Sequence, residues 1–403
     1  MHVVVIGAGV IGVTTAYYLS ELGCQVTVVD RHAEVADGAS FGNAGQLSYS
    51  FTDAMATPAF LAKIPGILLG RDSGIRVRPH PALLPWGLRF LAECTRRRAR
   101  ENTVTVLKIA LRSAQLMADL KKRLPFDFSH RDAGKMVLLD SEQALRNAEA
   151  GIELKRAFGC VTEVLTREAA IAMEPAIAEM PVKVLGAVYS RHDSVGDSRK
   201  FAMGLKQMLE KSGNVHFRLG TNVKRLVSNG SRIKGIELDD SELRGDAVVV
   251  CAGAWSSRLL KPVAVNPYIV PVRGYSVTLP LGSAPPAMSV TVLHKKAVFS
   301  RLNGALRIAG FADFLGFSER HDARRVSKLL ELARDVAPLA ADYGADGQSH
   351  WGGFRPMTPN GVPWVGSSRV GGLFLNTGHG SLGWTLACAS SHDIAQSVVW
   401  SLR

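Results

Sequence analysis

The chain is poor in cysteine and contains no long apolar run. Its five cysteines are an odd number, lie far apart and form no C-x-x-C pair. This pattern indicates neither a disulfide framework nor a cysteine-based metal site, and it favours reduced thiols in a cytoplasmic protein. No stretch reaches the roughly 18 uninterrupted apolar residues of a membrane-spanning helix. A strand-like run begins at residue 2, so no signal peptide is expected before the fold.

Acidic residues are scarce relative to basic ones. The chain carries 48 lysines and arginines against 35 acidic residues, which gives a formal net charge of +13 at pH 7. Such an excess is compatible with a nucleic-acid or an anionic-membrane partner. The sequence contains no recognised nucleic-acid module, so the membrane surface is the better candidate of the two. With 403 residues, 47% of them apolar, and 39 glycines, the composition is typical of a two-domain α/β enzyme.

The first thirty residues contain a dinucleotide-binding pattern. An apolar run over residues 3–6 breaks at a glycine-rich turn, passes into a helical stretch and returns as a second apolar run that ends at Asp30. In such a unit Gly7 permits the turn, Gly9 lets the backbone approach a pyrophosphate, and Gly12 lets the helix pack close to the strand. Asp30 lies where a carboxylate accepts hydrogen bonds from the hydroxyls of an adenosine ribose.

Two segments after this unit are irregular. Residues 38–47 are small and glycine-rich, which predicts a loop whose backbone comes close to a bound molecule. Residues 53–100 combine apolar pieces with several prolines, which predicts short helical turns with extended links. The arginine-rich segment 96–100 follows. These turns and arginines fit either a membrane interface or a solvated basic face that covers the core of the second domain.

The rest of the chain alternates helix and strand patterns. Apolar spacing predicts helices over about 102–124 and 322–337, a helix that begins near 198, and strands near 135–139, 223–227, 233–238 and 246–250. The alternating pattern over 271–311 predicts an antiparallel sheet in the second domain. Residues 351–361 are expected to form a constrained loop, and a glycine turn at 378–383 is expected to open a terminal helix.

Several stretches together resemble the FAD-dependent D-amino acid oxidase superfamily and, within it, the small subunit of bacterial D-amino acid dehydrogenases. They are the fingerprint over 7–30, the loop 40–46, and the segments 355–359 and 376–385. Shorter pieces near residues 196, 251 and 273 also look like that subfamily. The resemblance therefore covers essentially the whole chain.

This resemblance implies an α/β fold with a Rossmann-type FAD-binding domain similar to that of glutathione reductase. It also implies a second, α+β substrate domain built on a mixed or antiparallel sheet. Both domains are expected to be discontinuous. The FAD-binding domain would gather residues 1–55, 192–262 and 345–403, and the substrate domain would gather 56–191 and 263–344.

The activity implied by the resemblance is oxidation of a D-amino acid such as D-alanine, D-proline or a D-hydroxyproline. A hydride would leave the α-carbon for flavin N5, and water would hydrolyse the imino acid to a 2-oxo acid. Electrons would pass to a quinone or another membrane carrier, and the protein would be cytoplasmic with possible peripheral contact to the inner membrane. Two alternatives stay open: an oxidase of glycine or sarcosine that uses oxygen, and a non-catalytic flavin subunit of a membrane complex.

Three residues are candidates for the catalytic site. Arg355 is the candidate for holding the substrate carboxylate, because a planar guanidinium fork is the best fixed partner for that group. Its alternative role is to tie down the loop around it. Tyr275 and Tyr49 are candidates for a hydrogen bond to the same carboxylate or for shaping the pocket, and their alternative is a place in the core. No metal is expected, because no cluster of cysteine and histidine offers a site.

A larger set is expected to contact the cofactor. His379 is expected to contact the flavin rather than act as a base. The N–H groups of the glycine turn before the terminal helix would face the flavin, where negative charge grows on reduction. The residues expected to bind the cofactor are Gly7, Gly9, Gly12, Asp30, Arg31, Ser40, Asn43, Gly45, Gln46, Val223, Gly253, His379, Gly380, Leu382, Gly383 and Trp384.

Overall fold

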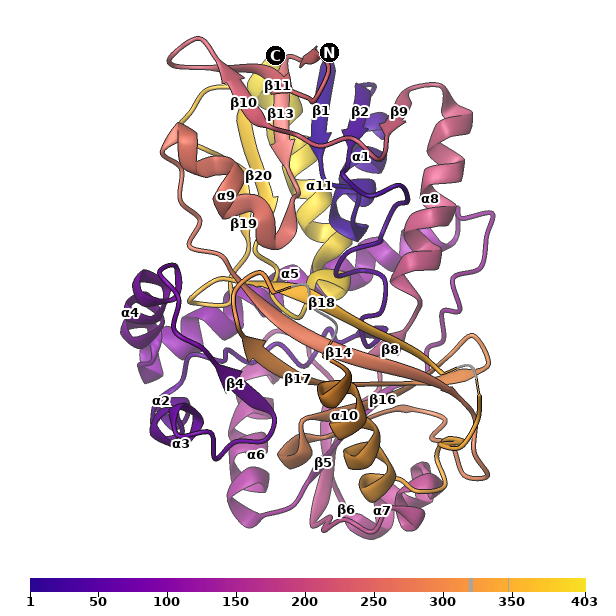
Figure 1. Cartoon of the computed structure of the whole chain (residues 1–403). Coiled ribbons are helices and arrows are strands. Elements are labelled where there is room, and N and C mark those ends of the chain that lie inside the picture. The colour runs from indigo at the N-terminus through magenta and orange to yellow at the C-terminus, as the bar shows by residue number, and fades with distance from the viewer. Residues whose placement is uncertain (319–321, 347) are drawn as a thin grey trace.

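Two large sheets form the framework of the computed structural model, which describes residues 1–318, 322–346 and 348–403. Among these described residues, one sheet has six strands and the other has nine. Figure 1 shows the six-stranded sheet and its helices in the upper half of the molecule and the nine-stranded sheet in the lower half. We call them the parallel sheet and the mixed sheet. Together they confirm the predicted α/β class.

The central strands of the parallel sheet are largely apolar and buried on both faces, whereas its edge strands are partly exposed. In spatial order its strands are β19 (Trp364–Ser367), β20 (Leu373–Thr377), β13 (Ala247–Val250), β1 (His2–Ile6), β2 (Gln25–Val29) and β9 (Val215–Arg218). One face is covered by α1 (Val10–Glu21), α8 (Ser198–Ser212) and α11 (Gly383–Leu402). The other is covered by α9 (Ser256–Leu260) and a small sheet of β10 (Arg225–Ser228), β11 (Ile233–Glu237) and β12 (Glu242–Arg244). Because both faces are buried at the centre of the sheet, the strands there read as largely apolar runs.

One face of the mixed sheet packs on a hydrophobic core. Part of the other face is covered by a helix over residues 142–156, and another part lines the cavity between the two halves. Its strand order is β18 (Ser349–Met357), β14 (Val270–Pro280), β17 (Ala305–Phe314), β16 (Ala297–Leu302), β15 (Ser289–Val292), β5 (Lys135–Leu139), β7 (Gly186–Ser190) and β6 (Thr162–Thr166), and β4 (Ile75–Val77) pairs with β17. The helices α10 (Ala323–Val336) and α7 (Arg167–Met173) pack on the core face. The antiparallel pairing of β14, β16 and β17 confirms the sheet predicted from the alternating pattern.

Short elements connect the two halves. The proline-broken stretch folds as predicted into short helices, α2 (Pro58–Leu61), α3 (Ile64–Leu68) and α4 (Leu83–Glu93). The helix α6 (Glu142–Arg156) follows β5, and the short pair β3 (Gln46–Leu47) and β8 (Ser194–Val195) lies near the junction. Single 3-10 turns occupy Pro175–Glu179, Gly253–Trp255, Lys261–Val263 and Leu293–Lys295. All five cysteines are buried as free thiols. Among the described residues, no helix combines the length and apolar character needed to span a bilayer.

Two segments differ from the sequence prediction. The constrained loop expected over 351–361 is for the most part the strand β18, which pairs with β14 along its whole length. This strand therefore belongs to the mixed sheet, although the domain prediction placed it with the FAD-binding residues. The helix expected near 102–124 is α5 (Arg96–Lys121), which starts earlier because Thr95 caps it by accepting a hydrogen bond from the N–H of Arg98. Its apolar side packs in the core beside α11 and not in that of the mixed sheet.

We predict that Gly12→Ala destabilises the protein, because the new Cβ would lie 1.7 Å from the carbonyl oxygen of Gly7 and push α1 away from β1. Overpacking of this kind typically lowers the free energy of unfolding by about 1–3 kcal/mol. Gly87→Ala is the matched control, since Gly87 also lies within a helix and nothing lies within 4 Å of a Cβ there. Chemical denaturation of the two holoproteins measures the difference. Unfolding midpoints that are equal for Gly12→Ala and the wild type would contradict the packing argument.

Candidate active site

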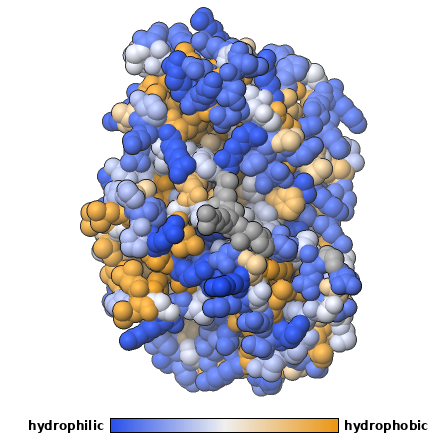
Figure 2. Space-filling view, in the orientation of Figure 1, coloured by the Kyte–Doolittle hydropathy of each residue, from blue (hydrophilic) through white to orange (hydrophobic). Residues whose placement is uncertain are grey.

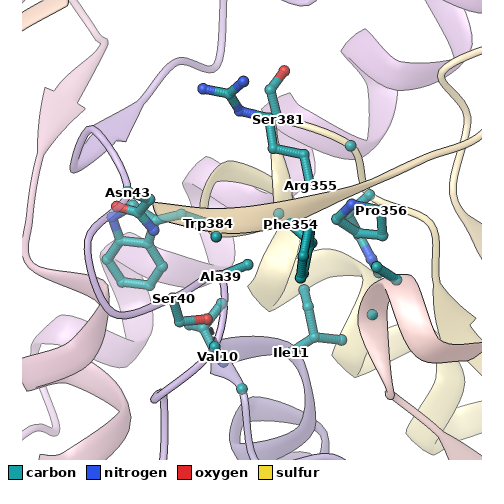
Figure 3. Close-up of a pocket in the computed structure, with 18 of the residues that line it drawn as sticks. Val10, Ile11, Ala39, Ser40, Asn43, Phe354, Arg355, Pro356, Ser381 and Trp384 are labelled. Atoms are coloured by element: carbon teal, nitrogen blue, oxygen red, sulfur yellow. Dashed lines mark hydrogen bonds between the residues drawn. The ribbon is translucent and has the colours of Figure 1, made fainter. Parts of the chain in front are cut away.

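A large cavity lies between the two halves of the molecule. Its volume is about 1260 Å³, and its walls come from the glycine-rich turn after β1, the loop before β3, the start of α11, and the strands β14, β17 and β18. Typical small-molecule pockets hold roughly 300–1,000 Å³, so this cavity has room for a long ligand and a small one together. Figure 3 shows β18 crossing the cavity with Phe354, Arg355 and Pro356, while Val10, Ile11 and Ser40 lie below it. Every residue that the sequence predicted for the site lines this cavity except Gly12 and Tyr49.

The glycine-rich turn leaves open backbone at one end of the cavity. Gly7 has φ +106°, and a Cβ there would lie 2.5 Å from the carbonyl oxygen of Cys251. Gly9 lines the cavity, and a Cβ there would meet only Ser40 Oγ, at 3.5 Å, so a side chain would fill the space over the turn. Gly9 also precedes α1 and has no side chain to cap it, but the N–H of Val10 donates to Ser40 Oγ at 3.0 Å. Gly12 does not reach the cavity, but the close helix packing predicted for it is present.

Asp30 joins the end of β2 to this turn. Its Oδ2 accepts a hydrogen bond from the backbone N–H of Ala8 at 2.6 Å, and its Oδ1 accepts one from the N–H of His32 at 2.9 Å. Burial acts to raise the pKa of Asp30, but the hydrogen bonds from His32 and Ala8 outweigh it and hold the pKa below its usual value. The carboxylate is therefore ionised at the cavity wall. Beside it, the guanidinium of Arg31 lies 4.0 Å from the ring centre of Trp255.

The loop before β3 presents its backbone to the cavity because its side chains are anchored elsewhere. The Asn43 amide donates to Ser198 Oγ at 2.7 Å and accepts from the N–H of Gly45 at 2.8 Å. Gln46 Nε2 donates to Ser289 Oγ on β15 at 2.6 Å. These bonds hold the loop between α8 and the mixed sheet, so in the structure Asn43 and Gln46 fix the shape of the wall.

The start of α11 forms the opposite end of the cavity. No side-chain cap of this helix is found in the described part of the chain, and residues 379–385 line the wall, so its first N–H groups are open to a ligand. His379 is buried, and its Nε2 lies 3.0 Å from Ser390 Oγ. Burial lowers the pKa of His379 to about 3, so the ring stays neutral near pH 7, which fits the expectation that it is not a base. The Trp384 indole donates to the carbonyl of Gly196 at 3.0 Å and closes the wall behind it.

Arg355 places a cation on the cavity wall. Its Nη1 donates to the carbonyl oxygen of Phe311 at 2.7 Å, and no other hydrogen bond or ion pair of this side chain is found among the described residues. A Cβ on Gly274 would lie 2.5 Å from the guanidinium carbon, so the guanidinium of Arg355 packs directly against the backbone of β14 at this glycine. Desolvation by the surrounding protein lowers the pKa of Arg355, against the attraction of Asp313, yet an arginine remains charged. Its remaining N–H groups are available to an anion.

Tyr275 forms part of the wall, but its hydroxyl is already engaged. It donates to Asp313 Oδ2 at 3.0 Å. Asp313 is fully buried and also pairs with Arg76 and with Arg325, whose Nη2 lies 2.8 Å from Oδ1. The hydroxyl of Tyr275 therefore belongs to a buried ion network, and of the two predicted roles the structure supports shaping the pocket.

The predicted contact between Tyr49 and the substrate is not supported. Its side chain is 4% exposed, packs in the core beneath the parallel sheet, and does not line the cavity. Its neighbour Phe51 lines the cavity instead. In an irregular segment no periodicity tells which side chain faces inward, so the sequence offered no basis for choosing between the two.

Lys135 is a cavity residue that sequence reasoning missed. It opens β5, is 3% exposed, and its Nζ donates to Ser48 Oγ at 2.9 Å. Burial lowers the pKa of Lys135 to about 8. A lysine at the start of an otherwise apolar strand was the available signal, but it reads equally well as an exposed strand end. The structure offers no cluster of three or more His, Cys, Asp or Glu side chains for a metal ion within its described residues.

Comparisons with known proteins agree with this geometry. A family model described as FAD dependent oxidoreductase (DAO) matches residues 2–397. The chain is 40% identical to D-amino acid dehydrogenase 2 of Ralstonia nicotianae over 410 residues, which cover 99% of this chain and 96% of that protein. It is 37% identical to the D-amino acid dehydrogenase of Dechloromonas aromatica, with coverage of 99% and 97%.

Solved structures with the same fold are more distant in sequence. Glycine oxidase from Geobacillus kaustophilus superposes with a TM-score of 0.77 at 22% identity, over 99% of this chain and 94% of that one. L-proline dehydrogenase from P. horikoshii superposes with a TM-score of 0.75 at 18% identity, over 98% and 92%. At these identities the likeness establishes the fold.

The cavity walls fit FAD. The start of α1, where the Val10 N–H donates to Ser40 Oγ, and the open backbone at Gly9 suit a pyrophosphate. The ionised Asp30 lies at the end where a ribose would be held. The uncapped start of α11 suits the electron-rich edge of a flavin. With the family match over nearly the whole length, the chain belongs to the FAD dependent oxidoreductase (DAO) family, and its cofactor is FAD.

Proposed function

We propose that the protein is a D-amino acid dehydrogenase that acts on a neutral or cyclic D-amino acid, such as D-alanine, D-proline or a D-hydroxyproline. It would convert the substrate to an imino acid and pass the electrons to a quinone or another membrane carrier. Water would hydrolyse the imino acid of a primary amine such as D-alanine to a 2-oxo acid and ammonia. Relatives at 33–40% identity over almost the full length carry the name D-amino acid dehydrogenase. The observation that carries the proposal is an arginine, Arg355, held on the cavity wall without a carboxylate partner among the described residues.

Arg355 suits the carboxylate that all amino acids share. Its fork is fixed at one nitrogen by the carbonyl of Phe311, so its direction is set before a ligand arrives. A carboxylate that meets the free edge of the fork replaces the lost hydration of a desolvated cation. Simple amines lack this group, so they would be held less firmly over the cofactor.

The walls near Arg355 suit a small apolar side chain. Phe311 is followed by Ala312, which pairs with Ile75 of β4, and all three line the cavity. Phe60 of α2 closes the same region. An apolar lining favours a side chain without charge, because burial of an unpaired charged group costs several kcal/mol.

The chain contributes orientation and charge to this reaction. Bound FAD supplies the acceptor for the hydride of the substrate α-carbon. Arg355 would hold the carboxylate, the apolar walls would exclude water from the α-carbon, and the open N–H groups of α11 would face the developing negative charge.

We also propose peripheral contact with an anionic membrane through the helices α3 and α4. Leu68, Leu69, Leu84 and Leu88 project from them with 62–71% of their surface exposed. Figure 2 shows hydrophobic surface at the left edge of the molecule, where Figure 1 places α2 to α4. The first turn of α5, with arginines at 96, 97 and 98, follows directly in the chain. Apolar side chains beside basic ones are the pattern that binds a membrane interface.

The substrate class is tested by an anaerobic screen of the purified yellow protein with D- and L-amino acids, glycine and N-methyl amines. We expect D-alanine, D-proline or a D-hydroxyproline to bleach the flavin and L-amino acids to leave it yellow. Reduction of an artificial dye should far exceed formation of hydrogen peroxide in air. Rapid peroxide formation with glycine or sarcosine would favour an oxidase, and a flavin that no amino acid bleaches would favour a non-catalytic subunit.

Replacement of Arg355 tests the carboxylate anchor. Charge-assisted hydrogen bonds contribute about 1.5–3 kcal/mol, so Arg355→Ala should lower kcat/KM ten- to a hundredfold or more. Arg355→Lys keeps the charge but loses the fork and should recover only part of the activity. FAD content should stay near that of the wild type. Arg334→Ala, at an exposed arginine outside the cavity, is the control; wild-type kinetics in Arg355→Ala would refute the assignment.

Membrane contact is tested with vesicles that contain phosphatidylglycerol. We expect binding at low salt that weakens as ionic strength rises, because surface charges are screened over roughly 8 Å at physiological salt. Leu84→Gln combined with Leu88→Gln should weaken binding at least tenfold, since burial of each leucine contributes about 1.5–3 kcal/mol. Leu339→Gln, at an exposed leucine outside α3 and α4, should bind like the wild type. Absence of binding at low salt would contradict the proposal.

A further inference from the structure

Lys135 is a buried cation that the proposed reaction does not use. It lies at the start of β5, where the next residue, Met136, points into the core of the mixed sheet. Lys135 points to the other face and lines the cavity, although only 3% of its surface is exposed. Burial of an ammonium group is costly unless partners compensate for lost hydration. Its partners therefore indicate what it does.

The protein compensates Lys135 only in part. Its Nζ donates to Ser48 Oγ at 2.9 Å and lies 4.2 Å from the ring centre of Phe51. No carboxylate lies within ion-pair distance of it among the described residues. Asp193 attracts it from further away, but Asp193 Oδ1 accepts the N–H of Ser50 and its Oδ2 has no partner in the described part of the chain. The cavity side of Lys135 is thus open to a ligand.

Ser48 connects Lys135 to the flavin end of the cavity. The backbone N–H of Ser48 donates to Thr385 Oγ1 at 3.0 Å, and Thr385 lies in the first turn of α11. The adenosine end is marked instead by Asp30, at the carboxyl end of β2. Lys135 therefore belongs with the ring system of the cofactor and not with its ribose.

We propose that Lys135 is an electrostatic residue of the flavin site, whose ammonium group stabilises the negative charge that arises there when the substrate is oxidised. The α-carbon of the substrate gives up two electrons with its proton, and the neutral amine becomes an iminium cation. The flavin end therefore gains one negative charge. Lys135 offers a fixed positive charge in a water-poor site, where such attraction is stronger than in bulk water. The proposal rests on the FAD site and not on the identity of the amino acid.

The charge of Lys135 depends on pH. Burial lowers the pKa of Lys135 to about 8, against the attraction of Asp193 and Asp53, while Lys155 lowers it further. Since a lysine is cationic below its pKa, the stabilisation should be complete near pH 6.5 and fade as pH rises past 8. An arginine at this position would keep its charge over the whole range.

The experiment compares holoproteins through sulfite binding to the flavin and through the flavin midpoint potential, neither of which requires an amino acid. Lys135→Met removes the charge at similar length and should weaken sulfite binding at least tenfold at pH 7 and lower the midpoint potential. Lys135→Arg should stay within about threefold of the wild type at pH 7. At pH 9.5 Lys135→Arg should bind sulfite more tightly than the wild type. Both proteins are compared at the same pH, so the ionisation of sulfite affects them equally.

Lys155→Met is the matched control. Lys155 is also buried and lies 5.8 Å from the ring centre of Phe51, but it pairs with Asp53 and does not line the cavity. It should leave sulfite binding within twofold of the wild type. Wild-type sulfite affinity and potential in Lys135→Met would overturn the proposal.

The proposal can still be tested if one of the two Lys135 variants does not retain FAD. If Lys135→Met does not retain FAD, the sulfite affinities of the wild type and Lys135→Arg at pH 7 and pH 9.5 test the proposal. Equal affinities of the two proteins at pH 9.5 would then overturn it. If neither variant retains FAD, Lys135 has a structural role and the proposal fails. Failure of the amino acid screen would leave these measurements intact, so the two proposals are tested separately.

Discussion

The N-termini of two helices, α1 and α11, face one cavity. At α1 the N–H of Val10 donates to Ser40 Oγ at 3.0 Å, and at α11 no side-chain cap is found among the described residues. Each helix start carries partial positive charge and unsatisfied donors, so it is stable beside an anionic ligand and costly beside apolar groups. The parallel sheet holds both helices on the same face. Close packing at Gly12 and open backbone at Gly9 then allow a pyrophosphate to reach one of them. The FAD site follows from this convergence.

Buried charges in this protein fall into two groups with different consequences. Asp313 is paired with Arg76, Arg325 and the hydroxyl of Tyr275, so its charge is compensated within the protein. Arg355 and Lys135 have no carboxylate partner among the described residues, and both line the cavity. A buried cation without a counterion is costly for folding. For both Arg355 and Lys135, a negatively charged ligand in the cavity would offset the cost of burying the cation.

The mixed sheet forms one side of the cavity. Its strands carry the apolar walls around Phe311, the fork of Arg355 at one side and the ammonium of Lys135 at another. Rigid strands hold such groups more precisely than loops do. The loop before β3 completes the wall because Asn43 and Gln46 anchor it to both halves of the molecule.

The sequence alone determined the parts of the structure that depend on local patterns. The strand, glycine turn and helix at the start, the acid at Asp30, and the antiparallel strands from β14 to β17 all follow from residue spacing within short windows, and the family resemblance added the FAD site and Arg355. Tertiary structure decided the rest. Gly353 and Pro356 read as loop residues, yet β18 is an edge strand, where proline is tolerated, and a Cβ on Gly353 would lie 1.9 Å from the Trp351 ring. Whether Tyr49 enters the core and Lys135 the cavity depends on contacts between segments far apart in the chain, which no local pattern encodes.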